Sequence, residues 1–252
     1  MSFSDAEIDR YARHLVLREI GGSGQQALKA ARVLIVGAGG LGAPAALYLA
    51  AAGVGRIGLA DPDHVSMSNL QRQVLYATGD IGRLKVEAAA ERLSGLNPEI
   101  EIAPHPTAVT TDNARTLVAG YDLVLDGTDD FATRFAVSDA CVAERKTLIS
   151  GALGRWTGQV GVFEGRPCYR CLVPDAPPDA ETCAAVGVIG ALAGVIGSMM
   201  AVEAVKRVTG AGTSLAGRLL IYDALAGETR TVRVGADPEC PTCGSPLRAS
   251  TE

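Results

Sequence analysis

Residues 33–42, VLIVGAGGLG, decide the fold of this chain. The run VLIVG (33–37) is short, apolar and closed by a glycine, which predicts a buried parallel strand. The following GGLGAPAALYLAAAG (39–53) predicts a helix that ends near its last glycine. Between them the chain matches G-x-G-x-x-G, at Gly37, Gly39, Gly40 and Gly42. This order predicts a phosphate-binding loop, because glycines let the backbone approach a phosphate and free N–H groups at a helix start bind anions. The alternative is a turn whose glycines serve only close packing.

Strands and helices alternate along the sequence around this loop. Apolar runs predict further strands at 57–61, 99–104, 122–126 and 147–150, and helices at 82–97 and 131–144. This alternation predicts an α/β fold with a Rossmann-like, mostly parallel sheet and helices on both faces. Later runs predict an apolar helix and three more strands, the last two as a hairpin around Ala226-Gly227: 186–209, 158–164, 218–224 and 228–234. We therefore expect one domain over residues 1–252, extended by C-terminal antiparallel strands.

Composition narrows the class of protein. The net charge of −5 and the pI near 5.3 argue against a general nucleic-acid binder, which would show a basic face. The polar start, MSFSDAEIDRYAR, lacks the pattern of a signal peptide, so a cytoplasmic location is the default expectation. Residues 184–202 carry no charge and are long enough to span a bilayer. They are rich in glycine and alanine, however, which favours a closely packed helix in a core or a subunit interface over a membrane span.

Polar residues follow the second predicted strand. Asp61 ends that strand, where a carboxylate can accept hydrogen bonds from ribose hydroxyls. In SNLQRQ (68–73), Arg72 can bind phosphate through two N–H groups, and Asn69 and Gln73 can bind phosphate or ribose. Lys85 supplies a second cation if a turn near 78–80 folds it back. The alternative places Lys85 on a solvated helix face and pairs Arg72 with a nearby aspartate. The glycine motif does not choose between NAD, FAD and ATP, but no histidine stands out as the general acid that a dehydrogenase needs.

Several motifs together resemble the ThiF/MoeB/HesA family, the bacterial relatives of ubiquitin-activating enzymes. They are GAGGLG, Asp61, SNLQRQ, Lys85, DLVLDGTDD (122–130), two C-x₂-C pairs and RYARHLVL (10–17), and the resemblance extends over about residues 6–244. It implies an adenylyltransferase that uses ATP and Mg²⁺ to activate the C-terminal glycine of a small ubiquitin-like sulfur-carrier protein ending in Gly-Gly. Residues 1–150 would then form the nucleotide-binding half, and residues 151–252 the partner-binding and zinc half.

The resemblance also implies roles for single residues. The loop glycines would lie against the nucleotide, Asp61 would hold the ribose, with Asp63 in the same site, and Asp129 would hold Mg²⁺. The phosphate contacts would come from Asn69, Arg72 and Lys85, with Gln73 beside them. Arg13 would reach the partner subunit's site, which implies a homodimer. The chain departs from the family at Asp130, where asparagine is usual, at Gly127, where cysteine is common, and at His14 in place of glutamine. We expect Asp130 to point away from the phosphates or to share the metal.

The cysteines fall into three groups. Cys168 and Cys171 form one C-x₂-C pair and Cys240 and Cys243 the other, which predicts a closed Cys₄ structural zinc site. The alternatives are redox-active disulfides and unpaired core cysteines. Cys183 follows the Pro- and Asp-rich PDAPPDAET, at a position where some family members use a cysteine covalently toward the carrier; a plain small apolar residue is the alternative. Cys141 lies in a predicted helix and is expected to pack.

Two further classes of function stay open on sequence alone. One is an NAD- or FAD-dependent oxidoreductase of Rossmann type, which leaves SNLQRQ, Lys85 and the cysteine pairs unexplained. The other is a non-catalytic ATP-binding scaffold. Within the adenylating class the carrier could serve molybdopterin, thiamine or another thiolated product. The sequence ends soon after the second C-x₂-C pair without a rhodanese-like extension, so we expect a separate sulfur donor protein. We expect residues 174–183 to help recognise the carrier.

Overall fold

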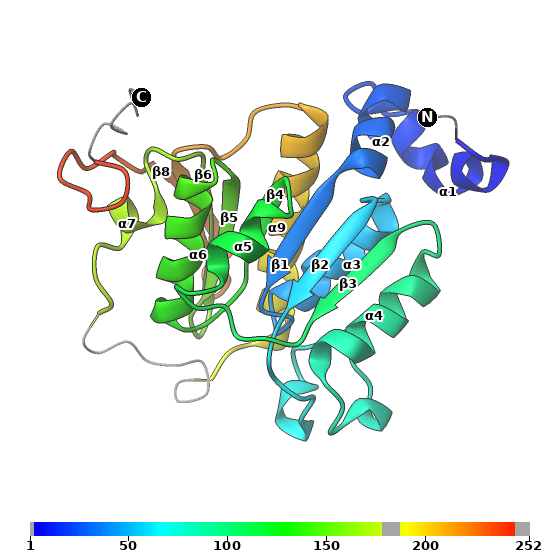
Figure 1. Cartoon of the computed structure of the whole chain (residues 1–252), viewed down its shortest axis with the longest axis horizontal. Helices are drawn as coiled ribbons and strands as arrows, with labels where there is room; N and C mark the ends of the chain where they lie inside the picture. The colour runs from blue at the N-terminus through cyan, green and yellow to red at the C-terminus, as the bar shows by residue number, and fades with distance from the viewer. Residues whose placement is uncertain (1–2, 178–186, 245–252) are drawn as a thin grey trace.

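A single mixed sheet organises the computed structural model, which describes residues 3–177 and 187–244 (Figure 1). Within these residues the sheet has eight strands in the order β3-β2-β1-β4-β5-β6-β7-β8. In chain order they are β1 (Arg32–Val36), β2 (Arg56–Ala60), β3 (Glu101–His105), β4 (Leu123–Asp126), β5 (Thr147–Leu153), β6 (Thr157–Phe163), β7 (Arg218–Asp223) and β8 (Glu228–Arg233).

The sheet changes character along its width. Strands β1 to β5 pair in parallel, with Val33 of β1 opposite Ile57 on one side and Leu123 on the other. The pairs β5–β6, β6–β7 and β7–β8 are antiparallel. The turn of the last hairpin includes Gly227, whose φ of +72° lies in the left-handed region that favours glycine. The predicted Rossmann-like sheet with its antiparallel extension is therefore confirmed.

Helices cover both faces of this sheet (Figure 1). They are α1 (Asp5–Leu15), α2 (Gly21–Ala30), α3 (Gly42–Ala52), α4 (Lys85–Leu96), α5 (Ala114–Ala119), α6 (Phe131–Ala143), α7 (Tyr169–Leu172) and α9 (Gly190–Thr209). Helices α3, α4 and α9 share one apolar core with alternate strand residues such as Ile35, and α5 and α6 share another with residues such as Leu34. Because both faces are buried, the central strands are continuously apolar.

The helix α9 contains most of the long uncharged run and packs closely against helix α3. A Cβ added at Gly197 would lie 2.4 Å from the Leu41 carbonyl oxygen and 2.5 Å from Pro44 Cγ, so α9 approaches α3 as closely as glycine allows. The prediction of a closely packed small-residue helix is confirmed. Over residues 3–177 and 187–244, no helix combines the length and apolar character that crossing a bilayer demands.

Some elements differ from the sequence predictions. The helix expected at 39–53 begins at Gly42, because residues 37–41 form the turn. The helix expected from 82 begins at Lys85, after the 3₁₀ turn Thr78–Asp80, where a turn was predicted. Helix α2 was not predicted, since its opening sequence GGSG is typical of a loop, and α5 is too short to give a clear helical period.

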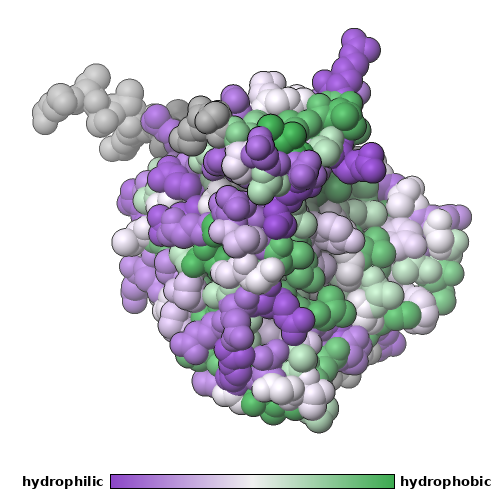
Figure 2. All heavy atoms as spheres, turned by 90° about the vertical axis from the view of Figure 1, so that its right-hand side faces the viewer, coloured by the Kyte–Doolittle hydropathy of each residue, from purple (hydrophilic) through white to green (hydrophobic). Residues whose placement is uncertain are grey.

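Hydrophilic and apolar residues are mixed over the side of the molecule that lies to the right in Figure 1 (Figure 2). This side includes β3 and α4. Strand β3 is only partly buried, in contrast to the fully buried β4 on the inside of the sheet. The cavity described next opens at the carboxyl ends of the central strands rather than at this outer edge of the sheet.

Candidate active site: a nucleotide-sized cavity and a cysteine cluster

A cavity of about 530 Å³ lies at the carboxyl ends of β1, β2 and β4. The connection from β1 leads to β2 on one side, while β4 pairs with β1 on the other, so the cavity lies where the strand order reverses. Open α/β sheets bind their ligands at this kind of point. The predicted residues that line it are Gly37, Gly39, Gly40, Asp61, Asp63, Asn69, Arg72, Gln73, Lys85 and Asp129.

The glycine turn is fixed by close contacts. Gly37 has a φ of +86°, and its N–H donates to the Ala60 carbonyl at 2.8 Å. Gly42 does not line the cavity, yet a Cβ there would lie 1.8 Å from the Gly37 carbonyl oxygen. Gly39 and Gly40 face Gln73 and Arg72, with 3.5 and 3.7 Å between an added Cβ and the nearest atoms of those side chains. The glycines thus leave a space beside the loop for a ligand, and longer side chains at these positions would fill that space.

Asp61 is held in place by backbone donors. Its Oδ2 accepts the Ala38 N–H and its Oδ1 accepts the Asp63 N–H, both at 2.8 Å. Each carboxylate oxygen has two lone pairs, so both oxygens can still accept a bond from a ligand hydroxyl. The fixed, buried carboxylate at the end of β2 therefore suits recognition of a ribose.

The structure rules out the purely structural placements that the sequence left open for Lys85 and Arg72. Lys85 is 5% exposed, so its placement on a solvated helix face is wrong. Its Nζ donates to Asp63 Oδ2 at 2.8 Å and lies 3.9 Å from Asp61 Oδ2. Arg72 donates from Nη1 to the Ser68 carbonyl at 3.0 Å, and within residues 3–177 and 187–244 it forms no ion pair with an aspartate. Both cations line the cavity, Lys85 in an ion pair with Asp63 and Arg72 without an acidic partner among the described residues.

Gln73 gives an independent sign that a polar ligand fits here. The side chain is 4% exposed and lines the cavity, and its Oε1 is buried without a hydrogen-bond partner among the described residues. A buried polar atom without a partner costs about 1–3 kcal/mol unless water or a ligand satisfies it. A bound nucleotide would offer such a partner.

Asp126, at the end of β4, organises the next turn. It is fully buried, and its Oδ1 accepts the Thr128 N–H at 3.0 Å and the Thr128 hydroxyl at 2.7 Å. Asp130 caps α6 by accepting the Thr133 N–H at 2.8 Å through its Oδ1, and it also lines the cavity. Asp129 lines the cavity and forms no hydrogen bond or ion pair within the described part of the chain. Both carboxylate oxygens of Asp129 are thus without a hydrogen-bond partner among the described residues, whereas one oxygen of Asp130 is used by the helix cap.

Sequence reasoning missed Arg134, which lines the cavity from α6 and is 5% exposed. Its guanidinium donates to the Thr128 carbonyl, to the Gly151 carbonyl at 2.7 Å and to Ser150 Oγ at 3.2 Å. Burial acts to lower the pKa of Arg134, but Asp126, Tyr169 and Asp129 together outweigh burial and raise it. The only available signal was an arginine one helical turn after Asp130, which by itself reads as a surface residue.

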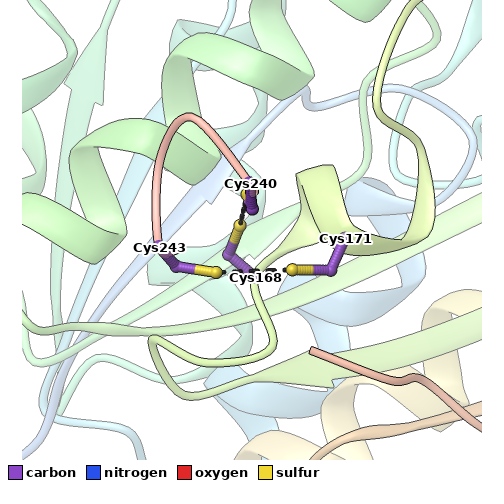
Figure 3. A group of neighbouring side chains, drawn as sticks. All are labelled: Cys168, Cys171, Cys240 and Cys243. Atoms are coloured by element: carbon purple, nitrogen blue, oxygen red, sulfur yellow. Dashed lines mark hydrogen bonds between the residues drawn. The ribbon is translucent and has the colours of Figure 1, made fainter. Parts of the chain in front are cut away.

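The four paired cysteines meet in one cluster (Figure 3). Cys168 precedes α7 and Cys171 lies within it, while Cys240 and Cys243 come from the loop after β8. All four Sγ atoms lie within 4.8 Å of one another, with 3.5 Å between Cys168 and Cys240 and 3.3 Å between Cys171 and Cys243. A tetrahedral Zn²⁺ with Zn–S bonds of about 2.3 Å would separate its sulfurs by about 3.8 Å. The donor set and its spacing therefore fit zinc.

The cluster's thiols differ in acidity. Burial raises the pKa of Cys168 and raises that of Cys243 to about 11. At Cys240 burial acts in the same direction, but hydrogen bonds with the backbone N–H groups of Cys243 and Thr242 and with the thiols of Cys168 and Cys243 together outweigh it and lower the pKa to about 7. All four cysteines are free thiols in the structure, so the alternative of disulfides is not realised. Cys141 is buried in α6, as expected for a packing residue.

The predicted residue Arg13 does not line the cavity of its own chain. Arg13 is exposed on α1, a helix that packs near the amino ends of the strands, where Arg10 donates to the Leu96 carbonyl at 2.9 Å. One chain therefore does not bring Arg13 to its own cavity. Cys183, and residues 178–182 of the segment expected to contact the carrier, lie outside the described residues.

Comparisons with known proteins agree on one family. The family model for the ThiF family matches residues 11–242. The sulfur carrier protein adenylyltransferase of Thermus thermophilus is 47% identical, over 97% of this chain and 93% of its own. The SAMP-activating enzyme E1 of Haloferax volcanii is 44% identical, with 97% and 92% covered. The probable adenylyltransferase/sulfurtransferase MoeZ of Mycobacterium tuberculosis is 46% identical, and this chain spans only 63% of it.

Solved structures show the same fold at lower sequence identity. Escherichia coli MccB, in a crystal structure with MccA-N7isoASN, superposes with a TM-score of 0.84 at 21% identity, over 97% of this chain and 76% of that one. Such a likeness establishes the fold alone. The family match covers nearly the whole chain, and the resemblance inferred from its motifs is confirmed. The chain belongs to the ThiF family.

Proposed function

We propose that this protein uses ATP to adenylate the C-terminal glycine of a small ubiquitin-like sulfur-carrier protein ending in Gly-Gly. The observation that carries the proposal is the convergence of Arg72, Lys85 and Asp129 on one cavity beside the glycine loop. Support also comes from relatives of 44–47% identity whose names describe sulfur-carrier adenylation or SAMP activation. The activated carrier would serve thiocarboxylate formation, in molybdopterin or thiamine biosynthesis or a similar pathway.

The residues of the cavity suit this reaction. The carrier's terminal carboxylate attacks the α-phosphorus of ATP, the bond to the β-phosphate oxygen breaks, and pyrophosphate leaves. A carboxylate is already a nucleophile at neutral pH, so the site needs no general base. What it must supply is alignment and positive charge along the phosphates. Among the described residues Arg72 has no acidic partner to give up, and Lys85 can exchange its bond to Asp63 for one to a phosphate.

The cavity offers partners for the ribose, the phosphates and the metal ion of the nucleotide. Asp61 would accept from the ribose hydroxyls, the N–H groups of the glycine loop would face the phosphates, and Gln73 and Asn69 would bind phosphate or ribose oxygens. Asp129 would hold Mg²⁺, because it is the carboxylate of the β4 turn without a protein partner among the described residues. When bound, the metal ion neutralises charge that develops on the phosphates.

The second half of the chain would hold structure and partners. We propose a division at about residue 150 between a nucleotide-binding half and a half for zinc and the carrier. Zinc at the cysteine cluster would fasten the C-terminal loop to α7. We further propose a homodimer in which Arg13 reaches the partner subunit's cavity, since it lies too far to serve its own. Sulfur would come from a separate donor protein, and Cys183 is the candidate for a covalent link to the carrier.

Mass spectrometry tests the proposal directly. Carriers of the molybdopterin and thiamine types are incubated separately with the protein, ATP and Mg²⁺, and pyrophosphate release is followed. We expect one carrier to gain the mass of AMP with a matching amount of pyrophosphate. Arg72→Gln should abolish the adduct, whereas Arg115→Gln, at an exposed arginine paired with Glu144, should not. ATP binding without any adduct would favour a non-catalytic scaffold, and binding of NAD or FAD instead of ATP would favour the oxidoreductase.

A further inference from the structure

The short helix α7 belongs to two sites at once. Cys168 and Cys171 direct their sulfurs into the cysteine cluster (Figure 3), while Tyr169, between them, is 4% exposed and lines the nucleotide cavity. Val173, just after the helix, lines the cavity as well. The four-residue helix α7 and the residue before it therefore carry both two predicted zinc ligands and part of the wall of the predicted active site.

Tyr169 contacts the residue that shapes the β4 turn. Its ring lies 5.8 Å from that of Phe163 in an edge-to-face arrangement and 6.1 Å from that of Phe135. The guanidinium carbon of Arg134 lies 5.9 Å from the Tyr169 ring centroid, within cation–π range. Arg134 in turn donates to the carbonyls of Thr128 and Gly151. Tyr169 thus borders the arginine that holds the turn carrying Asp129.

The same helix is tied to α6 on its other side. Asp139 of α6 accepts from Arg170 Nη2 and Nε, both at 2.9 Å, and from the Thr242 hydroxyl at 2.7 Å. One carboxylate thereby joins α7 to the loop that carries Cys240 and Cys243. A single helical turn does not hold its shape alone, because fixing the first turn costs more than its one hydrogen bond returns. The position of α7 therefore depends on these anchors.

We infer that the cysteine cluster positions the nucleotide site through Tyr169 and Arg134, and that Tyr169 is a positioning residue for the β4 turn. The inference rests on the proposed use of ATP. Metal at the cluster holds α7, α7 holds the Tyr169 ring against Arg134, and Arg134 holds the Thr128 carbonyl beside Asp129. Loss of the metal should weaken nucleotide binding while the parallel sheet stays folded, because the sheet core contains none of the four cysteines.

The test compares variants by calorimetric titration with a non-hydrolysable ATP analogue and Mg²⁺, with zinc content measured by mass spectrometry and folding by circular dichroism. We expect Tyr169→Leu to keep its zinc and its fold and to bind the nucleotide about fivefold more weakly, as the loss of one buried cation–π contact implies. Tyr169→Phe, which keeps the ring, should bind within about twofold of the wild type. Tyr222→Leu, at a half-buried tyrosine outside the cavity, is the matched control and should bind normally.

The second arm asks whether the cluster and Tyr169 act through the same connection. Chelation of zinc should weaken nucleotide binding by the wild type about as much as Tyr169→Leu does, and should add little in that variant. If chelation unfolds the chain, Arg170→Gln in the zinc-loaded protein replaces it, because that change removes the link to Asp139 and leaves the cysteines intact. Additive losses, or normal binding by Tyr169→Leu, would overturn the inference. A wild type that binds no ATP would instead refute the proposed function.

Discussion

The variant Lys85→Gln tests whether this buried cation contributes to catalysis, to stability or to both. The ammonium group lies in the cavity, within 2.8 Å of Asp63 Oδ2 and 3.9 Å of Asp61 Oδ2. A unit charge about 4 Å from a developing phosphate charge is worth about 4 kcal/mol at an effective dielectric constant of 20. Glutamine keeps a hydrogen-bond donor but no charge, so we expect a loss of about 3 kcal/mol in transition-state stabilisation. That corresponds to a fall of about 100-fold in kcat/KM.

Stability should change little in the same variant. The Asp63 carboxylate is 65% exposed and can be rehydrated, and Asp61 keeps its two backbone N–H donors. We therefore expect no more than about 1 kcal/mol of lost stability, which for a chain of this size lowers Tm by about 2–4 °C. Pyrophosphate release with the carrier measures the first effect and calorimetry the second. Lys29→Gln, outside the cavity, is the control and should keep full activity. A large fall in Tm with unchanged kcat/KM would refute the assignment of Lys85.

Three further predictions follow from single contacts. Gly42→Ala should prevent soluble expression or lower Tm strongly, because its Cβ would overlap the Gly37 carbonyl oxygen at 1.8 Å, and limited proteolysis checks this. Lys29 hydrogen-bonds Glu7 and lowers its pKa below the usual 4.5, so the stability from this pair is present above that pH and is lost as pH falls through the lowered pKa. Lys29→Gln should flatten this acid limb in denaturant titrations. Cys240→Ser should lower bound zinc from about one ion per chain, measured by mass spectrometry, whereas Cys141→Ser should not.

The fold was predictable because its signals are local. A glycine turn between an apolar strand and a helix needs only about twenty residues of sequence to be recognised, and the alternation of strands repeats it. The C-x₂-C pairs were equally clear, since their spacing matches the geometry of a four-thiolate site before the fold is known. The Cys₄ cluster then brings together two segments that 68 residues separate in the chain.

Long-range contacts explain what the sequence did not reveal. Arg134 acts through carbonyls of Thr128 and Gly151, and only the pairing of β4 with β5 brings these together. Tyr169 likewise reads as an aromatic residue between two cysteines until α7 is placed beside α6. The burial of Lys85 had no local signal either, because it follows from the strand-like bridge between His64 and Leu84 that returns the chain to the cavity. Each of these roles depends on tertiary placement.

The charges around the cavity distinguish an adenylating site from a generic dinucleotide fold. The glycine loop and Asp61 would serve NAD as well as ATP, since both carry a ribose and phosphates. A reaction at the α-phosphorus needs cations beyond the loop, and Arg72 and Lys85, which both line the cavity, would supply two. It also needs a carboxylate free for a divalent ion, and Asp129 is unpaired within the described residues while Asp130 is engaged as a helix cap. We therefore propose that the residues specific to adenylation lie within 69–85 and 126–134 rather than in the glycine motif.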